Sequence, residues 1–400
     1  MGHVSIRKEK QEDLKTVILQ KDMLLVLGAI FFVYVNLFNS LTILPLYVKN
    51  IGGSDFEAGL LSTIFTLSAV ILRFFLGSLP DRLGRKLPLL VGSFVFATSS
   101  LLIWLAPNLV WQALARAYQA IGMATFLAAG SLVVSDLTPV KLRGSVMGIY
   151  RLVTVLAFMV GPFLALSLIN NYGYDQYFIS NALICFVSFG LVLFLRETPE
   201  SKKKDVISPF SNTKLLFQNV TLTKTYIAMA IVASCYSVLI TYVGIFAGSQ
   251  AGIDNLGLFF TLFACIGGLA GILGGVASDY WGRSRVLWPA VSIFGIGLMV
   301  ISFLSQLQGW ALYFGAALSG IGFFGTRPIL IAWVVDVADE KIAATALAMQ
   351  ENAIDGSYAL SSFLFGLLTF HASYAVIYFF WGLVSALSPL FILKLFKAKI

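Results

Sequence analysis

The chain has 400 residues, of which 58% are hydrophobic and only 12% are charged, and its formal net charge is +8. An ordinary soluble domain carries about 25% charged residues, so this composition excludes a soluble globular class, which needs a polar exterior. The basic residues lie in short segments between long apolar runs. That pattern also excludes a nucleic-acid-binding face.

Twelve apolar stretches follow one another along the chain, each with about the 20 residues that a transmembrane helix needs. They cover residues 23–46, 56–79, 87–106, 108–133, 143–169, 176–195, 224–248, 254–277, 286–305, 309–335, 342–369 and 373–396. The first stretch is longer than a signal-peptide core and lacks a clear cleavage site, so we expect it to be retained. The sequence therefore predicts an all-α membrane protein with twelve transmembrane helices.

The longest polar segment, residues 196–223, separates the sixth stretch from the seventh. We expect a cytoplasmic loop there between two six-helix bundles, residues 23–195 and 224–397, with residues 1–22 as a cytoplasmic tail. If both termini are cytoplasmic, 22 of the 27 Lys and Arg residues face the cytoplasm and only Lys49 lies on the opposite side. Because cytoplasmic loops carry the excess of Lys and Arg, we expect this orientation in a bacterial or archaeal plasma membrane.

A charged loop follows the second stretch and reads Gly-Ser-Leu-Pro-Asp-Arg-Leu-Gly-Arg-Lys from Gly77 onward. Gly77 allows two helices to approach closely, and Gly84 allows a tight turn. Arg82 and Arg85 would hold the loop at the anionic cytoplasmic surface. Asp81 could accept hydrogen bonds from a helix N-terminus, whose partial positive charge favours a carboxylate. A simple topology anchor at that surface is one interpretation of these residues.

The same pattern recurs 198 residues later, after the eighth stretch, at Asp279, Gly282 and Arg283. Two further matches, 200 residues apart, are Gly122 with Gly322 and Asp136 with Asp336. A self-match at so long a period indicates duplicated halves. Two six-helix halves in parallel orientation are a known plan of secondary transporters.

The loop that begins at Gly77 resembles the signature loop of the major facilitator superfamily at every defining position, and the resemblance covers the whole chain. It implies the major facilitator fold, with two pseudo-symmetric six-helix bundles, and secondary active transport by alternating access. In that family the aspartate at the position of Asp81 contacts the start of the eleventh helix and holds the cytoplasmic gate shut. The resemblance therefore implies a gating role for the residues of this loop and of its repeat. By repeat symmetry, Asp279 would contact the start of the fifth helix.

Two intramembrane motifs add to this resemblance. Arg116 and Gln119 are similar to the family's Arg-x-x-Gln-Gly-x-Gly pattern in the fourth helix, where the arginine is tied to proton coupling or substrate binding. Gly161 and Pro162 resemble part of the spaced-glycine pattern that the efflux branch has in its fifth helix. A structural role is the alternative for both motifs: a buried cation held by its neighbours, and a kinked, closely packed helix.

Glu351 and Asp355 are the acidic residues deep inside the predicted helices, and their spacing of four places them on one helix face. An intramembrane acid marks a functional site by default. We predict that Glu351 pairs with Arg327 or Arg73 and takes part in proton coupling. A buried pair that only holds the second bundle together is the alternative.

Arg151 occupies the repeat position of Glu351, 200 residues earlier. Four intramembrane arginines against two acids would suit an anionic substrate, unless some of them snorkel to the surface. The first helix of each bundle lines the cavity in the family, and polar side chains there could orient a ligand. The candidates are Asn36, Asn39 and Tyr236.

The sequence has no nucleotide-binding loop, no metal-ligand spacing of His and Cys, and no nucleophile–base pair. We therefore expect no enzyme activity, cofactor or metal. The overall resemblance and the partial Gly-Pro pattern favour proton-coupled efflux of drug-like, amphipathic or metabolite compounds, by a lipid-embedded monomer that binds no nucleic acid. The alternatives are proton-coupled uptake or exchange of an organic anion or sugar, and a non-transporting sensor or lipid-handling protein on the same fold.

Overall fold

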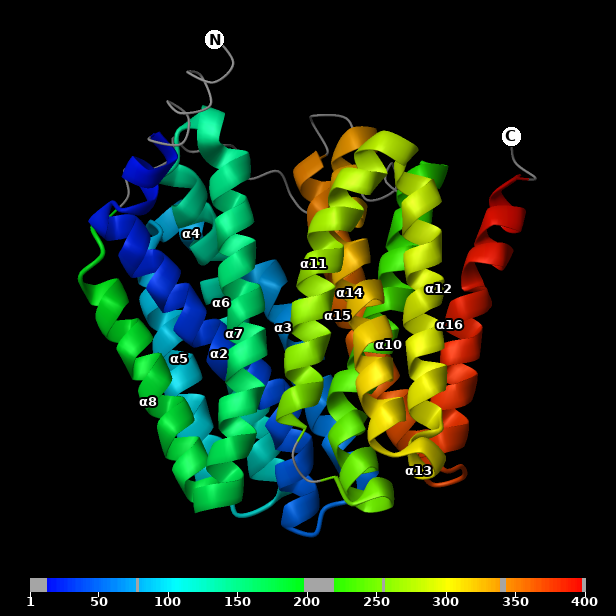
Figure 1. The fold of residues 1–400 in the computed structure, drawn as a ribbon. Coiled ribbons are helices and arrows are strands. Elements are labelled where there is room, and N and C mark those ends of the chain that lie inside the picture. The colour runs from blue at the N-terminus through cyan, green and yellow to red at the C-terminus, as the bar shows by residue number, and fades with distance from the viewer. Residues whose placement is uncertain (1–12, 77–78, 198–218, 254–255, 339–342, 398–400) are drawn as a thin grey trace. The chain divides into compact units, whose positions relative to one another are not determined.

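Long α-helices make up nearly all of the described chain (Figure 1). The computed structural model describes residues 13–76, 79–197, 219–253, 256–338 and 343–397. Within these ranges twelve helices have 20 or more residues. They are α2 (Lys21–Asn50), α3 (Asp55–Leu76), α5 (Lys86–Leu105), α6 (Leu109–Asp136), α7 (Arg143–Tyr172), α8 (Tyr174–Leu193), α10 (Val220–Ala251), α11 (Gly257–Trp281), α12 (Arg283–Ser302), α14 (Gly309–Val337), α15 (Ala343–Leu368) and α16 (Tyr374–Lys397).

Eleven of these helices are long and apolar enough to cross a membrane. The remaining one is α15, which carries Glu351 and Asp355. Its 26 residues rise about 39 Å at 1.5 Å per residue, which exceeds the roughly 30 Å of a bilayer core. The predicted all-α membrane fold of twelve helices is confirmed.

Short helices, and glycines with positive φ angles, connect the long helices. The segments α4 (Leu79–Leu83), η1 (Val140–Leu142) and α13 (Leu304–Leu307) are short connectors. Gly84 and Gly282 have φ angles of 81° and 92°, in the region that side chains disfavour. The predicted tight turn at Gly84 is therefore confirmed, and the second half repeats it.

Two units of internal contact divide the chain. Unit 1 comprises residues 1–40, 71–161 and 172–206, and unit 2 comprises residues 41–70, 162–171 and 207–400. In unit 1, α5 packs against α6 and α8, and in unit 2 the corresponding α12 packs against α14 and α16. The division by contacts cuts through α2, α3 and α7, whereas the bundle boundaries predicted from the sequence follow the duplication and stay a prediction.

The duplicated halves share a close helix contact. A Cβ on Gly122 of α6 would lie 2.9 Å from Cδ2 of Phe96 on α5. A Cβ on Gly322 of α14 would overlap the side chain of Phe294 on α12 and lie 2.7 Å from its Cα. Because Phe294 follows Phe96 by 198 residues, both halves use a glycine at the same place to bring the same pair of helices together.

Candidate functional site

Arg116 is a fully buried cation inside unit 1. It lies seven residues into α6, about 10 Å along the helix. Its Nη1 donates to Ser40 Oγ at 2.7 Å and to Gln119 Oε1 at 2.5 Å, and Ser40 Oγ donates to the same oxygen at 3.1 Å. A charge at this depth is costly without such partners, so the predicted Arg116–Gln119 pair forms the centre of a polar site completed by α2.

Asn36 and Asn39 are buried in a hydrogen-bonded network, and their role in lining a cavity stays a prediction. Asn36 Nδ2 donates to Ser100 Oγ at 3.0 Å and to the carbonyl oxygen of Asn181 at 2.9 Å. Asn39 Nδ2 donates to Asn181 Oδ1 at 3.1 Å. A Cβ on Gly161 would lie 2.8 Å from Asn39 Oδ1, so the predicted Gly-Pro segment of α7 approaches this network closely. The network joins α2, α5 and α8 through hydrogen bonds inside an apolar surrounding.

An ion pair and an aromatic stack connect α10, α14 and α15 in unit 2. Arg327 Nη2 on α14 lies 3.6 Å from Glu351 Oε1 on α15, so the predicted pairing of these two residues is confirmed. The Arg327 guanidinium lies over the ring of Phe323, 5.7 Å from its centroid. The ring of Tyr236 also stacks on the Phe323 ring, with the two centroids 4.1 Å apart. The Glu351 side chain is 45% exposed. A charged group eight residues into a transmembrane helix must face protein or water rather than lipid.

The other predicted intramembrane residues occupy different environments. Asp355 is buried, one turn beyond Glu351 on α15. Arg151 on α7 is exposed, and its carbonyl oxygen accepts a hydrogen bond from Thr154 Oγ1 at 2.8 Å. Pro162 lies inside α7, which continues through it. The roles assigned to these residues, and the approach of Arg73 to the eleventh transmembrane helix, stay predictions.

Matching ion pairs stand at the predicted cytoplasmic ends of both halves. In unit 1, Arg85 Nε donates to Asp136 Oδ2 at 3.1 Å. In unit 2, Arg283 Nε donates to Asp336 Oδ2 at 2.9 Å. The internal repeat therefore includes an Arg–Asp ion pair that is formed by the same two atoms in both halves. Each pair ties the loop that follows one helix to the end of the helix two spans later.

Several residues of the predicted gate fall partly or wholly outside what the structure describes. Gly77 lies outside the described residues, and so do the side chains of Asp81 and Arg82. Asp279 is an ion-pair partner of Arg283, and its side chain is 62% exposed. The contacts predicted for Asp81 with the eleventh transmembrane helix and for Asp279 with the fifth stay predictions.

A tight contact at the opposite ends of the helices was not predicted from the sequence. Within unit 2, Tyr242 of α10 donates from its hydroxyl to the carbonyl oxygen of Ser362 on α15 at 2.6 Å. A Cβ on Gly59 of α3 would overlap that hydroxyl and lie 2.5 Å from the same carbonyl oxygen. Thr63 Oγ1 donates to the carbonyl oxygen of Ala359 at 2.9 Å. We call Gly59, Thr63, Tyr242, Ala359 and Ser362 the outer contact.

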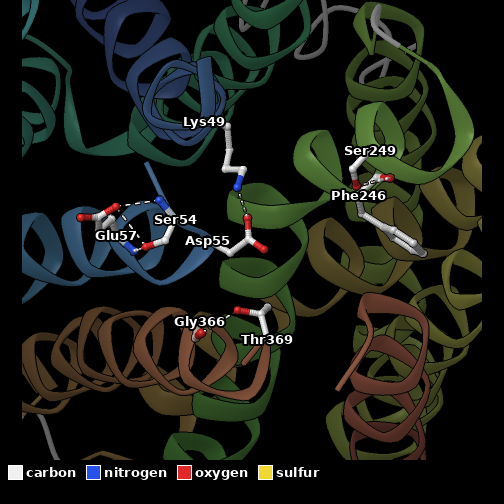
Figure 2. Close-up of polar contacts among 8 residues, drawn as sticks. All are labelled: Lys49, Ser54, Asp55, Glu57, Phe246, Ser249, Gly366 and Thr369. Carbon is white, nitrogen blue, oxygen red and sulfur yellow. Dashed lines mark hydrogen bonds and ion pairs between the residues drawn. The ribbon is translucent and has the colours of Figure 1, made fainter. Parts of the chain in front are cut away.

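An ion pair and a helix cap hold the start of α3, the helix that carries Gly59 and Thr63 (Figure 2). Lys49 Nζ lies 2.9 Å from Asp55 Oδ1, which joins the end of α2 to the start of α3. Ser54 and Glu57 cap α3 reciprocally, because Glu57 Oε2 accepts from Ser54 N at 2.6 Å and Ser54 Oγ accepts from Glu57 N at 3.2 Å. The ring of Phe56 then packs against Phe363 and Phe370, with centroids 5.6 and 5.8 Å apart.

Comparison with known proteins decides the family. The sequence profile described as Major Facilitator Superfamily matches residues 26–349 and 250–399 of the chain. The chain belongs to the major facilitator superfamily. Among solved structures of this fold, nucleoside transporter NupG superposes with a TM-score of 0.80 at 12% identity, over 92% of this chain and 99% of that one. Peptide transporter POT in complex with sulfate superposes with a TM-score of 0.76 at 13% identity, over 94% of each chain.

Curated relatives of this superfamily are similar over shorter stretches. "Multidrug resistance protein MdtG" of Proteus mirabilis is 30% identical over 275 residues, which cover 64% of this chain and 65% of that protein. The protein of the same name from Citrobacter koseri is 28% identical over 330 residues, which cover 78% of this chain and 79% of that protein. The predicted family resemblance is confirmed. Since this is a family of membrane transporters, the prediction that the chain is not an enzyme is confirmed with it.

Ser100, Asn181, Tyr242 and Gly59 are the major residues that sequence reasoning missed. Ser100 and Asn181 had one available signal, because a buried Asn or Ser in an otherwise apolar helix needs a partner. Tyr242 carried a weaker signal, as one polar side chain in a mostly apolar helix. Gly59 carried no signal in the sequence, because its importance depends on which helix lies opposite.

Proposed function

We propose that this chain is a secondary transporter that exports small amphipathic or drug-like compounds from the cytoplasm in exchange for protons, by alternating access. The relatives named as multidrug resistance proteins support efflux. The observation that carries alternating access is the outer contact, in which α3 meets α10 and α15 without a gap at Gly59. Substrate release to the outside requires these helices to part, and substrate entry from the cytoplasm requires them to stay together.

Glu351 is the carboxylate best suited to carry the coupling proton in this proposal. Its partner Arg327 is 3.6 Å away, and the Glu351 side chain is 45% exposed, so the carboxylate is accessible enough to exchange a proton. Protonation removes the attraction to Arg327 and changes which conformation is favoured. Arg116 and Gln119 would contribute a second polar surface, since they hold a buried positive charge in the other unit.

A second function has one observation in its favour. Four intramembrane arginines stand against two intramembrane acids in the sequence, an imbalance that favours uptake or exchange of an organic anion. Both functions place the protein in a plasma membrane, acting as a monomer with both termini in the cytoplasm.

Transport in oriented vesicles separates the two functions. Candidate ligands are first found by thermal shift of the purified protein, because a ligand stabilises the state it binds. In vesicles with the cytoplasmic face outward and an acidic lumen, efflux by exchange predicts that a ligand drives proton release from the lumen and accumulates there. Proton movement in the same direction as the ligand, or accumulation driven by the anion gradient alone, would support uptake or exchange instead.

A further inference from the structure

An apolar groove lies between α10 and α16 in unit 2. Its volume is about 350 Å³, at the lower end of the 300–1,000 Å³ typical of small-molecule sites. It exposes no polar surface. Ser388, the one lining residue with a hydroxyl, donates to the carbonyl oxygen of Ser385 at 2.7 Å. The principal lining side chains are Ile227, Ile231, Val384, Leu387, Phe391 and Ile392.

Two hydrogen bonds between α10 and α16 mark one end of the groove. Cys235 Sγ on α10 donates to Ser385 Oγ on α16 at 2.9 Å, and Trp381 Nε1 donates to Ser234 Oγ at 2.9 Å. These two bonds join the helices near mid-length, so the groove runs from there toward the end where α10 begins and α16 ends. From Cys235 to Ile227 this is eight residues, about 12 Å of helix. The charge distribution predicts that this end is cytoplasmic, so the groove lies at the depth of the inner-leaflet acyl chains.

Lys224 lies on the same face of α10 as two residues that line the groove. Lys224 precedes Ile227 by three residues and Ile231 by seven, so all three lie on one face of α10. Along this face of α10, a cation near the membrane surface is followed by the apolar side chains of the groove. An amphiphile with an anionic headgroup and a long apolar chain has the complementary order, and anionic lipids are concentrated in the cytoplasmic leaflet.

We propose that the groove binds one acyl chain of an anionic phospholipid, whose headgroup lies at Lys224. The absence of polar surface in the groove excludes a polar transport substrate as its occupant, because buried polar groups need partners. A bound chain would fill the space between α10 and α16 on the cytoplasmic side of their two hydrogen bonds. This inference does not depend on which solute the protein transports.

Photo-crosslinking with a labelled lipid tests the site. The purified protein is reconstituted in vesicles that contain phosphatidylglycerol with a diazirine on one acyl chain, and labelled peptides are mapped. Labelling is expected to concentrate on the segments around Ile231 and Leu387, at least fivefold above other lipid-exposed helices, and to fall severalfold when the label is moved to phosphatidylcholine. Labelling spread evenly over lipid-exposed residues, or equal for the two lipids, would overturn the proposal.

Three variants make the test specific. Ile231→Trp fills the groove and should reduce labelling at least fivefold. Lys224→Gln leaves the groove intact and should abolish only the preference for phosphatidylglycerol. Leu390→Trp is the control, since Leu390 is 60% exposed on α16 but does not line the groove, and it should label as the parent protein does. Unchanged labelling in Ile231→Trp, or competition by transported solutes rather than by unlabelled phosphatidylglycerol, would contradict a lipid occupant.

Discussion

Gly59 and Tyr242 meet so closely that a methyl group on Gly59 would occupy the space of the Tyr242 hydroxyl. The glycine belongs to α3 and the tyrosine to α10, and both lie in unit 2. The tyrosine hydroxyl is fixed by its hydrogen bond to the carbonyl oxygen of Ser362 at 2.6 Å. Any side chain larger than hydrogen at position 59 must therefore separate α3 from α10 and α15.

Gly59→Val should hold the outer contact open and reduce transport at least tenfold without preventing folding. Gly248→Val is the control, because Gly248 lies on α10 with no atom within 4 Å of a built Cβ. Transport is measured in vesicles, and opening is measured by labelling Thr63→Cys with a membrane-impermeant thiol reagent in a cysteine-free background. Full transport by Gly59→Val would show that α3 does not need to approach Tyr242 during the cycle.

Tyr242→Phe should shift the same equilibrium by a smaller amount, because it removes one hydrogen bond and keeps the ring. Hydrogen bonds between transmembrane helices contribute about 0.6–1.7 kcal/mol, which corresponds to roughly a 3- to 20-fold change in the open fraction. Thiol labelling at position 63 should rise by that factor. Tyr378→Phe is the comparison, since the Tyr378 hydroxyl donates to the carbonyl oxygen of Val238 at 3.0 Å. That bond joins α16 to α10 and does not involve α3, so its loss should leave the labelling unchanged.

Glu351→Gln should abolish the pH dependence of transport, because the amide cannot release a proton and no longer attracts Arg327. Glu351→Asp keeps a titratable group and should retain a pH dependence, though with weaker pairing to a guanidinium already 3.6 Å away. The measurement is the initial transport rate across a series of pH values in vesicles. A pH profile that is the same in Glu351→Gln and the parent protein would remove Glu351 from the coupling step.

The repeated charge pairs should differ in their effect on stability because they differ in burial. The Arg85 and Asp136 side chains are 7% and 26% exposed, whereas those of Arg283 and Asp336 are 22% and 50% exposed. Removing one partner of a buried pair costs up to about 3–5 kcal/mol, and an exposed pair contributes about 0–1 kcal/mol. Arg85→Gln should therefore lower the Tm in detergent clearly more than Arg283→Gln does. Equal losses in Tm would show that burial of Arg85 does not set its contribution.

Asn181→Leu should destabilise unit 1, since it removes the buried hydrogen bond that Asn39 Nδ2 donates to Asn181 Oδ1 at 3.1 Å. A buried polar group that loses its partner costs about 1–3 kcal/mol. Asn171→Leu is the matched control, because Asn171 is exposed and donates to a carbonyl oxygen of its own helix. Thermal unfolding should show a lower Tm for Asn181→Leu alone, and the same Tm as the control would mean that the amide network adds nothing to stability.

The sequence predicted features that depend on the cost of polar groups in lipid. The twelve helices follow from apolar length, and the pairing of Glu351 with Arg327 follows because neither charge can face acyl chains. The turn at Gly84 followed from a motif, and its repeat at Gly282 followed from the duplication. Each of these predictions needs only local sequence or an internal repeat.

The features that were missed depend on which helices lie opposite one another. Asn36 and Asn39 were expected to line a cavity, and both donate hydrogen bonds in a buried network, to Ser100 and Asn181 on other helices. The outer contact requires α3 to lie against α10 and α15. Apolar periodicity identifies the buried face of a helix without naming the residue that it meets.

A disulfide across the outer contact tests the proposed transport cycle most directly. Thr63 Oγ1 lies 2.9 Å from the carbonyl oxygen of Ala359, so Thr63→Cys and Ala359→Cys in a cysteine-free background should cross-link on oxidation. Alternating access predicts that oxidation stops transport, that reduction restores it, and that each single-cysteine variant is unaffected. Undiminished transport by fully cross-linked protein would contradict the claim that α3 and α15 must part at this point in every cycle.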